Sequence, residues 1–188
     1  MTRLVYGVGI NDVPRSASKR NPIYTAWYGM LTRCFSRTYQ EKWPTYISCT
    51  VCDEWLRLSN FSAWALGQEF EGMSLDKDIL IAGNKHYCPE ACVFVPAWLN
   101  IFISNMKAKP RGNMPMGVQQ YGKRFVARFG CRDTAIYLGS FSSASAAHSA
   151  YMAARKVEVA KRIAEYDSMP FSDPEVTQAL VRFFGKDI

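Results

Sequence analysis

Long apolar runs are missing from this 188-residue sequence, and so is a basic segment followed by an apolar stretch at its start. A membrane-spanning helix needs about 20 predominantly apolar residues in a row, and a secretory signal peptide needs a charged segment before its apolar core. We therefore expect neither of them. A cytoplasmic protein without membrane contact is predicted, in a compartment that keeps thiols reduced.

Histidine is scarce too, and internal repeats and low-complexity tracts are absent. The chain has only His86 and His148. Histidine is the side chain whose ordinary pKa suits proton transfer near neutral pH, so few positions can supply a general base. A hydrophobic content of 48% with 14% aromatic residues is enough to build the core of one domain or of two small ones.

The net charge of +7 is unevenly distributed. Residues 105–165 hold eleven Lys and Arg against three Asp and Glu, whereas residues 1–104 hold ten against nine. Residues 53–90 reverse the sign, with seven acids against three bases. An excess of positive charge confined to one third of the chain predicts a surface for a polyanion, and an acidic segment beside it suits metal-assisted phosphodiester hydrolysis. Ordinary solvated surface charge is the alternative.

The pattern of apolar residues divides the chain. Residues 105–116 are rich in Pro, Gly and Lys and lack hydrophobic periodicity, which predicts a basic linker. It separates a module at 1–104 from a small domain at 117–165 and a tail at 166–188. Residues 174–184 of the tail predict a short final helix, whose apolar side is formed by Val176, Leu180, Val181 and Phe184. Before the linker, apolar residues fall at helical spacing in 22–35 and 50–68. The run "ACVFVPAWLN" (91–100) is typical of a short buried strand or extended segment that ends at Pro96, with a helix from about Ala97.

After the linker the period changes to two. In residues 124–129, Phe125, Ala127 and Phe129 alternate with two arginines and a valine. Another strand follows at 134–143, and then an alanine-rich helix with a serine available as its N-cap. The predicted fold class is α+β. A mixed helical, ββα-like module comes first, and a small three-stranded antiparallel sheet covered by one helix follows.

The stretches "GVQQYGKRFVARF" and "AIYLGSFSSASAAHSAYMAARK" resemble the plant Apetala-type, or ethylene-response-factor, DNA-binding domain. In that family the sheet lies in the major groove of double-stranded DNA. Phe125 stands where the plant domain places a tryptophan or an arginine, so the base preference does not carry over. A small domain with a merely basic sheet is the alternative. The resemblance implies that the DNA contacts come from Gln119, Gln120, Tyr121, Lys123, Arg124, Arg128 and Arg132.

Such domains also follow the nuclease module of phage and intron-borne HNH homing endonucleases, which the whole chain resembles. "LDKDILIAGN" stands where these enzymes carry Asp-His-Ile-Asp-Gly-Asn, and "YCPEACVFVPAWLN" stands where Asn-Leu-Arg and a final Asn follow. The resemblance implies a ββα-metal site for Mg²⁺ or Mn²⁺, with Asp76 and Asn100 as ligands and Glu90 beside them. For a phage protein, the compartment is the cytoplasm of the host cell.

Lys77 is the main departure from that pattern, because it stands where the catalytic histidine should be. A lysine with an ordinary pKa near 10.4 is a poor base at neutral pH, and neighbouring aspartates raise its pKa further. His86 is then the candidate base, provided that a two-stranded hairpin returns it toward Asp76 or Asp78. The catalytic set of this interpretation is His86, Asp78 and Lys77.

Two other interpretations of residues 73–100 remain open. Cys49 and Cys52, with Cys88 and Cys92, supply the four thiolates of a structural Zn²⁺ site, although 35 residues separate the pairs and no glycine shapes the second. Alternatively, the charged side chains have a purely structural role in a hairpin. The sequence therefore predicts either a metal-dependent DNA endonuclease or a non-catalytic, sequence-specific DNA-binding protein that acts as a regulator or host-interference factor.

Overall fold

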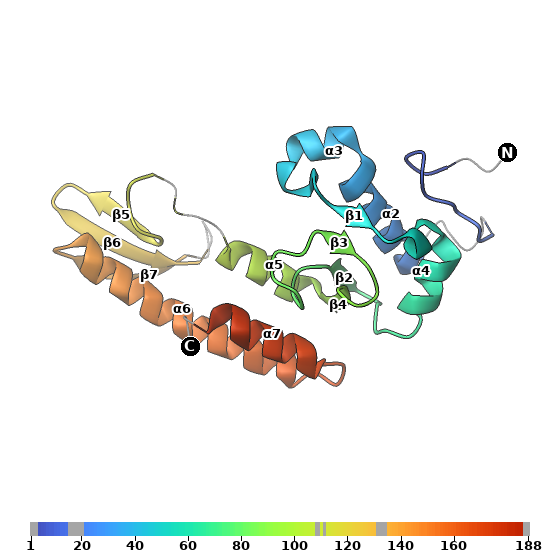
Figure 1. The fold of residues 1–188 in the computed structure, drawn as a ribbon. Coiled ribbons are helices and arrows are strands. Elements are labelled where there is room, and N and C mark those ends of the chain that lie inside the picture. Colours follow the sequence, from blue (N-terminus) through green and yellow to red (C-terminus); the bar gives the residue numbers. More distant parts are fainter. Residues whose placement is uncertain (1–3, 15–20, 108–109, 111, 131–134, 186–188) are drawn as a thin grey trace. The chain divides into compact units, whose positions relative to one another are not determined.

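The computed structural model describes residues 4–14, 21–107, 110, 112–130 and 135–185. The chain divides into two compact units, Met1–Ile101 and Phe102–Ile188 (Figure 1). The predicted fold class is confirmed, because the protein mixes helices and strands and contains a three-stranded antiparallel sheet packed against a helix. Among the described residues, no helix is long and apolar enough to cross a membrane.

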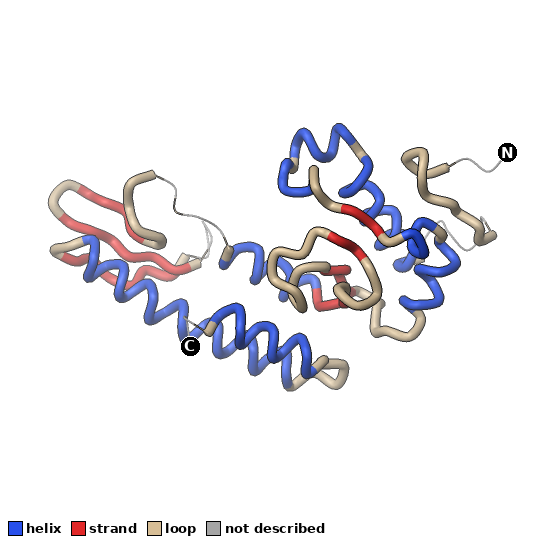
Figure 2. Tube along the Cα trace, viewed as in Figure 1, coloured by secondary structure: helices blue, strands red, loops and turns tan. Residues whose placement is uncertain are grey.

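The first unit combines helices with short strands, as Figure 2 shows by colour. Strand β1 pairs in parallel with β3, and β2 pairs antiparallel with β4. The elements are helices α2 (Pro22–Phe35), α3 (Arg37–Lys42) and α4 (Leu58–Ala65), the 3₁₀ helices η1 (Pro44–Tyr46) and η2 (Asp53–Leu56), and strands β1 (Thr50–Val51), β2 (Met73–Asp76), β3 (His86–Tyr87) and β4 (Val93–Pro96).

Helix α2 confirms the helix predicted at 22–35. Its first turn is fixed by Asn21, whose side chain accepts a hydrogen bond from the backbone N–H of Ile23, and by a proline at the first helical position. The apolar stripe is buried, with Trp27 fully inaccessible to solvent. The Trp27 indole N–H donates to the carbonyl oxygen of Trp55 at 2.7 Å. This bond satisfies the polar atom of a buried tryptophan.

The single helical pattern predicted over 50–68 is wrong in its first half. Residues 50–57 form β1 and η2, and the helix begins only at Leu58. The reason is tertiary pairing: β1 hydrogen-bonds with β3, and the backbone N–H of Ile10 donates to the carbonyl oxygen of Leu56. The aromatic side chains Trp55 and Phe61 of this segment are nevertheless buried in the core, with their rings 5.0 Å apart.

Strands β2 and β4 are followed directly by helix α5 (Ala97–Met106), which confirms the strand that ends at Pro96 and the helix after it. The register pairs Asp76 with Val93 and Met73 with Pro96. Asp76 therefore lies at the end of the two-stranded ladder farthest from the junction with α5. All four residues of β4 are buried, as expected for an apolar run without alternation.

The second unit holds the three-stranded sheet, in the order β5 (Val118–Tyr121), β6 (Arg124–Phe129) and β7 (Ile136–Phe141). Helix α6 (Ala144–Asp167) covers one face of this sheet (Figure 1). The Ser143 hydroxyl accepts a hydrogen bond from the backbone N–H of Ala146 and caps the helix. Ala127 and Ala147 are fully buried between sheet and helix, so small side chains allow a close approach.

Gly117 shows why this unit needs a glycine before β5. Its φ is +75°, a left-handed conformation that favours glycine. A Cβ atom at this position would also overlap the ring of Tyr151 on α6. Tyr151 in turn contacts Phe129 and stacks against His148, at ring distances of 5.6 and 6.0 Å. The end of the sheet is thus anchored to α6 through one aromatic ring.

Helix α7 (Pro174–Phe184) confirms the final helix predicted in the tail. It lies alongside the second half of α6 (Figure 1), and the Tyr166 hydroxyl of α6 accepts a hydrogen bond from the backbone N–H of Asp173 at 3.0 Å. Val176, Leu180 and Phe184 are buried as expected. Val181, which was expected on the same apolar side, is 46% exposed.

Candidate functional site

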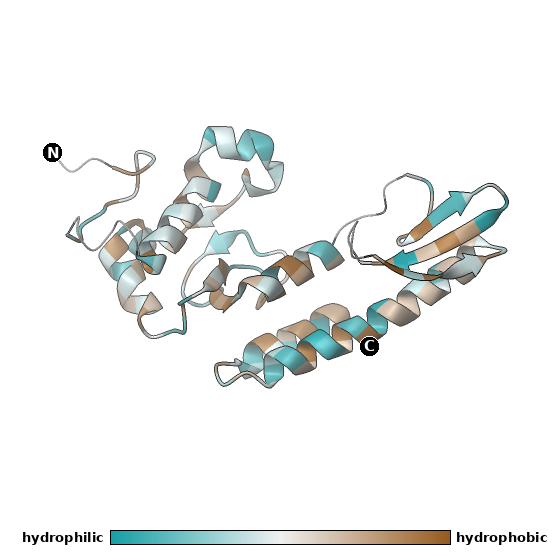
Figure 3. Ribbon diagram, turned by 180° about the vertical axis from the view of Figure 1, so that it is seen from behind, coloured by the Kyte–Doolittle hydropathy of each residue, from teal (hydrophilic) through white to brown (hydrophobic). Residues whose placement is uncertain are grey.

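The face of the sheet opposite α6 has no covering element among the described residues of its unit, and we call it the open face. Strand alternation places Arg124 and Arg128 on this face, because Ala127 between them is buried against α6. The three strands contain no aspartate or glutamate. Figure 3 shows β5 as mostly hydrophilic beside the more apolar β6. The open face consists of Gln119, Tyr121, Arg124, Val126, Arg128, Tyr137 and Ser140.

Arg124 is held in place on the open face by the neighbouring strand. Its Nε donates to the hydroxyl of Ser140 at 3.2 Å, and its Nη2 donates to the Ser140 carbonyl oxygen at 2.6 Å. A guanidinium has five N–H groups, so others remain for an external acceptor. Within β5, the Tyr121 hydroxyl donates a hydrogen bond to the side-chain oxygen of Gln119 at 3.1 Å. These contacts fix the orientation of the polar side chains before any ligand binds. The sequence periodicity predicts only the face of the sheet on which they lie.

A β-bulge adds Tyr137 to the open face, which the sequence pattern did not predict. The register with β6 shifts between Ala127, which pairs with Gly139, and Arg128, which pairs with Tyr137. The extra residue, Leu138, packs against the core beneath α6. Tyr137 is 57% exposed, and the guanidinium of Arg128 lies 6.0 Å from the centre of its ring. Such a cation–π pair orients a cation without neutralising it.

The remaining predicted DNA contacts lie elsewhere. Gln120 is exposed but pairs in register with Phe125, a residue of the α6-facing layer, and its amide donates to the carbonyl oxygen of Gly122. Lys123 is exposed in the turn between β5 and β6. Arg132 lies outside the described residues. Gln119, Tyr121, Arg124 and Arg128 are therefore the predicted contacts that share the open face.

In the first unit, Asp76 forms a local turn at the end of β2. Its Oδ1 accepts hydrogen bonds from the backbone N–H groups of Asp78 and Ile79, at 2.7 and 2.9 Å. Burial, and next the negative charge of Asp78, raise the pKa of the Asp76 carboxyl above its ordinary value. A metal ligand must be ionised. A bound cation would supply a positive charge that favours the ionised form of this carboxyl.

Lys77 is one of the buried polar residues of the unit, with 7% of its surface exposed. Its Nζ donates to the carbonyl oxygen of Asn84 at 2.9 Å and lies 3.5 Å from the Asp78 carboxylate and 5.9 Å from the centre of the Tyr87 ring. These partners hold the Lys77 side chain in place. The position that holds the catalytic histidine in the HNH pattern thus carries a cation that ties the loop together.

Asn84 and His86 complete this loop. The Asn84 amide donates to the carbonyl oxygens of Lys77 and His86, at 2.7 and 2.6 Å, and its oxygen accepts from the His86 N–H at 3.1 Å. The His86 ring is exposed, and its Nδ1 lies 2.8 Å from the Thr50 hydroxyl. Strand β3, which carries His86, pairs with β1 and not with β2. The hairpin expected to return His86 toward Asp76 is therefore not formed by β2 and β3.

The other predicted ligands are dispersed over the same segment. Glu90 is exposed, and hydrogen bonding from its own backbone N–H, followed by the Cys88 thiol, lowers its pKa. Asn100 lies half-buried on α5, and Asp78 lies beside Lys77. Within the described part of the chain, no group of three or more His, Cys, Asp or Glu side chains is placed to hold a metal ion. The divalent-metal site remains a prediction.

The cysteines of the predicted zinc site are free thiols in differing environments. Cys49 and Cys92 are buried, whereas Cys52 and Cys88 are partly exposed. Burial raises the pKa of Cys52, Cys88 and Cys92, so each favours its protonated form. Zinc requires thiolates. The Zn²⁺ site therefore stays a prediction, and these three thiols offer it no preformed thiolate.

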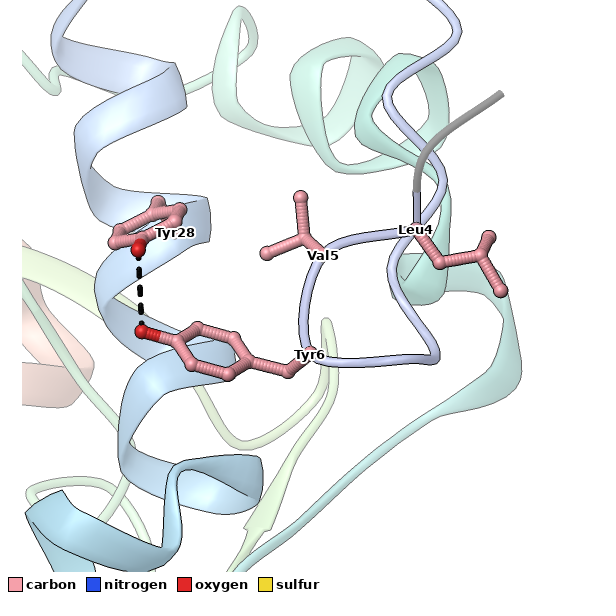
Figure 4. Close-up of a pocket in the computed structure, with 4 residues that line it drawn as sticks. All are labelled: Leu4, Val5, Tyr6 and Tyr28. Atoms are coloured by element: carbon pink, nitrogen blue, oxygen red, sulfur yellow. Dashed lines mark hydrogen bonds between the residues drawn. The ribbon is translucent and has the colours of Figure 1, made fainter. Parts of the chain in front are cut away.

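A tyrosine-lined cavity of about 380 Å³ lies near the start of the chain, bounded by Leu4, Val5, Tyr6 and Tyr28 (Figure 4). Tyr6 has a φ of +52°, which is unusual for a residue with a side chain. Its hydroxyl donates to the Tyr28 hydroxyl at 3.1 Å and accepts from Thr32. The close-up shows the two hydroxyls facing each other.

Comparison of the chain with protein-family models, with curated proteins and with solved structures found no match. We therefore infer the function from the geometry and the charge of each unit.

Proposed function

We propose that this protein binds double-stranded DNA through the open face of its three-stranded sheet. The observation that carries the proposal is the pair Arg124 and Arg128, exposed on an acid-free face and flanked by the exposed rings of Tyr121 and Tyr137. The surrounding residues 105–165 hold eleven basic side chains against three acidic ones. Clustered basic charge on one face is the usual electrostatic footprint of a nucleic-acid-binding domain.

The spacing of the two arginines suits a duplex. Side chains four residues apart on a strand point the same way and lie about 13 Å apart, a span that covers several phosphates or adjacent base edges. The contacts of Arg124 with Ser140 fix its fork before binding, which reduces the side-chain entropy lost on complex formation. The exposed Tyr137 hydroxyl adds a donor for a phosphate oxygen.

The test is a salt titration of the full 188-residue chain on a fluorescent DNA duplex, followed by anisotropy. Arg124→Ala and Arg128→Ala should each weaken binding and lower the slope of log K against log salt by about 0.9. Lys156→Ala and Lys161→Ala are the matched controls, because both exposed lysines project from α6. A chain that does not bind at about 50 mM salt, where phosphate contacts are strongest, would end the proposal. Lysine variants that weaken binding more than the arginine variants would place the contact on the helix.

A second candidate function is divalent-metal hydrolysis of DNA phosphodiester bonds by the first unit, as in the phage-type HNH homing endonucleases that the sequence resembles. The order β2, β4, α5 favours it, since two antiparallel strands followed by a helix are the elements of a ββα-metal module. Asp76, the last residue of β2, is a ligand in this proposal. Incubation of supercoiled plasmid with Mg²⁺ or Mn²⁺ tests it. Asp76→Ala should abolish cutting and spare binding, whereas a wild-type protein that binds without cutting is the non-catalytic regulator.

A further inference from the structure

A groove runs along α2 in the first unit, and neither the open face nor the Asp76 segment accounts for it. It has a volume of about 460 Å³. One wall is a stripe of α2 from Pro22 to Arg33, and the other is formed by Gly72 and β2 with the first residue of α5. From Pro22 to Arg33 the helix rises about 16 Å. The groove is therefore long enough for an extended chain segment.

Gly29 keeps the helix wall of this groove bare. It lies in the interior of α2, where glycine is less favourable than alanine. A Cβ atom at Gly29 would have no other atom within 4 Å, so no packing contact requires a glycine. The backbone is in the ordinary helical conformation, so no positive φ requires one either. An unfilled helix position beside a groove indicates space kept for something outside the chain.

The lining chemistry is that of an anion site. Among the described residues that line the groove, Arg33 is the one cation, Thr25 and Ser74 carry hydroxyls, and none has a carboxylate. The half-buried Arg33 guanidinium donates to the neutral Tyr87 hydroxyl at 3.5 Å, and among the described residues no carboxylate lies within ion-pair distance of it. The charge of Arg33 is therefore not neutralised by the described part of the protein.

We propose that this groove binds the sugar-phosphate backbone of a nucleic-acid strand, with Arg33 as its phosphate anchor. The inference rests on the proposed DNA binding, and it adds a contact in the first unit. An arginine fork with hydroxyl groups matches the geometry of phosphate oxygens. The N-terminus of α2 adds the positive end of a helix dipole at one end of the groove. The length favours a strand over a lone phosphate ion.

The test uses the full chain, a labelled DNA duplex and two independent groove variants. Arg33→Gln should weaken binding about tenfold or more, as expected for the loss of a charged hydrogen bond, and should lower the salt slope by about 0.9. Arg37→Gln removes the same charge from α3, where the side chain is 94% exposed and paired with Glu41, and should change neither as strongly. Gly29→Leu should weaken binding by filling the groove while leaving every charge in place.

Thermal melting followed by circular dichroism separates misfolding from lost contacts. If Arg33→Gln unfolds, Gly29→Leu carries the test, because its side chain enters open space. Wild-type affinity in a folded Gly29→Leu protein would overturn the groove while the open-face variants still decide the proposed function. NMR shifts of the Gly29 amide supply the second readout. A shift with duplex supports the proposal, and an equal response to inorganic phosphate alone would reduce the groove to a small-anion site and overturn it.

Discussion

Replacing Gly117 with alanine should loosen the sheet from α6, and the structure gives the size of the effect. The φ of +75° costs a residue with a Cβ atom about 1–2 kcal/mol. Overlap of that Cβ with the Tyr151 ring adds about 1–3 kcal/mol, the range for overpacked sites. We therefore expect Gly117→Ala to lower the free energy of unfolding of the second unit by about 2–5 kcal/mol.

Gly122→Ala is the matched control, because Gly122 has a φ of +57° but a Cβ atom added there would meet no other atom within 4 Å. Only the backbone penalty of about 1–2 kcal/mol applies there. Hydrogen exchange of the β6 amides, read by mass spectrometry, reports the opening of this unit alone. Equal losses of protection in the two variants would refute the packing of Tyr151 on Gly117.

Three further predictions concern the first unit. Lys77→Met should lower the free energy of unfolding of the first unit by about 1.5–3 kcal/mol, because the carbonyl oxygen of Asn84 loses a charged donor. Urea titration followed by tryptophan fluorescence measures the change, and an unchanged midpoint would contradict the prediction. Folding raises the pKa of Asp76 above the ordinary value of 3.8, so the stability that this carboxyl contributes is present below pH 3.8 and is lost as the pH rises through the folded-state pKa. Asp76→Asn should therefore have a higher free energy of unfolding than wild type at about pH 7 and not at about pH 3. Burial raises the pKa of Cys34 to about 12, so iodoacetamide should label the partly exposed Cys88 well before Cys34, and equal labelling rates would exclude that difference in environment.

Much of the fold could be predicted because local pattern and tertiary structure agree over several segments. Helix α2 has a cap, a proline at its first position and an apolar stripe, and β6 alternates cleanly. The interval 50–57 could not be predicted, because its strand depends on pairing with residues more than thirty positions later, at 86–87. Spacing alone cannot show that a distant segment will replace helical hydrogen bonds.

The candidate site was predictable to the level of a face and no further. The alternation in β6 put Arg124 and Arg128 together, but the anchoring of Arg124 by Ser140 requires the register of β7. The sequence indicates that Lys77 is a poor base, and only the structure shows that its ammonium holds the loop through Asn84. The open space beside Gly29 could not be predicted, because no sequence pattern indicates an open space beside a helix.

The bulge in β7 also bears on how this surface can change. An extra residue in one strand puts the two ends of β7 out of phase, so Ser140 and Tyr137 face the same side although they are three positions apart. Deleting Leu138 would restore simple alternation, with Tyr137 and Ser140 two positions apart and still on the same side. The length of β7 can therefore change by one residue while Tyr137 and Ser140 keep their places on the open face, and the contact that is lost is that of Leu138 with the core beneath α6.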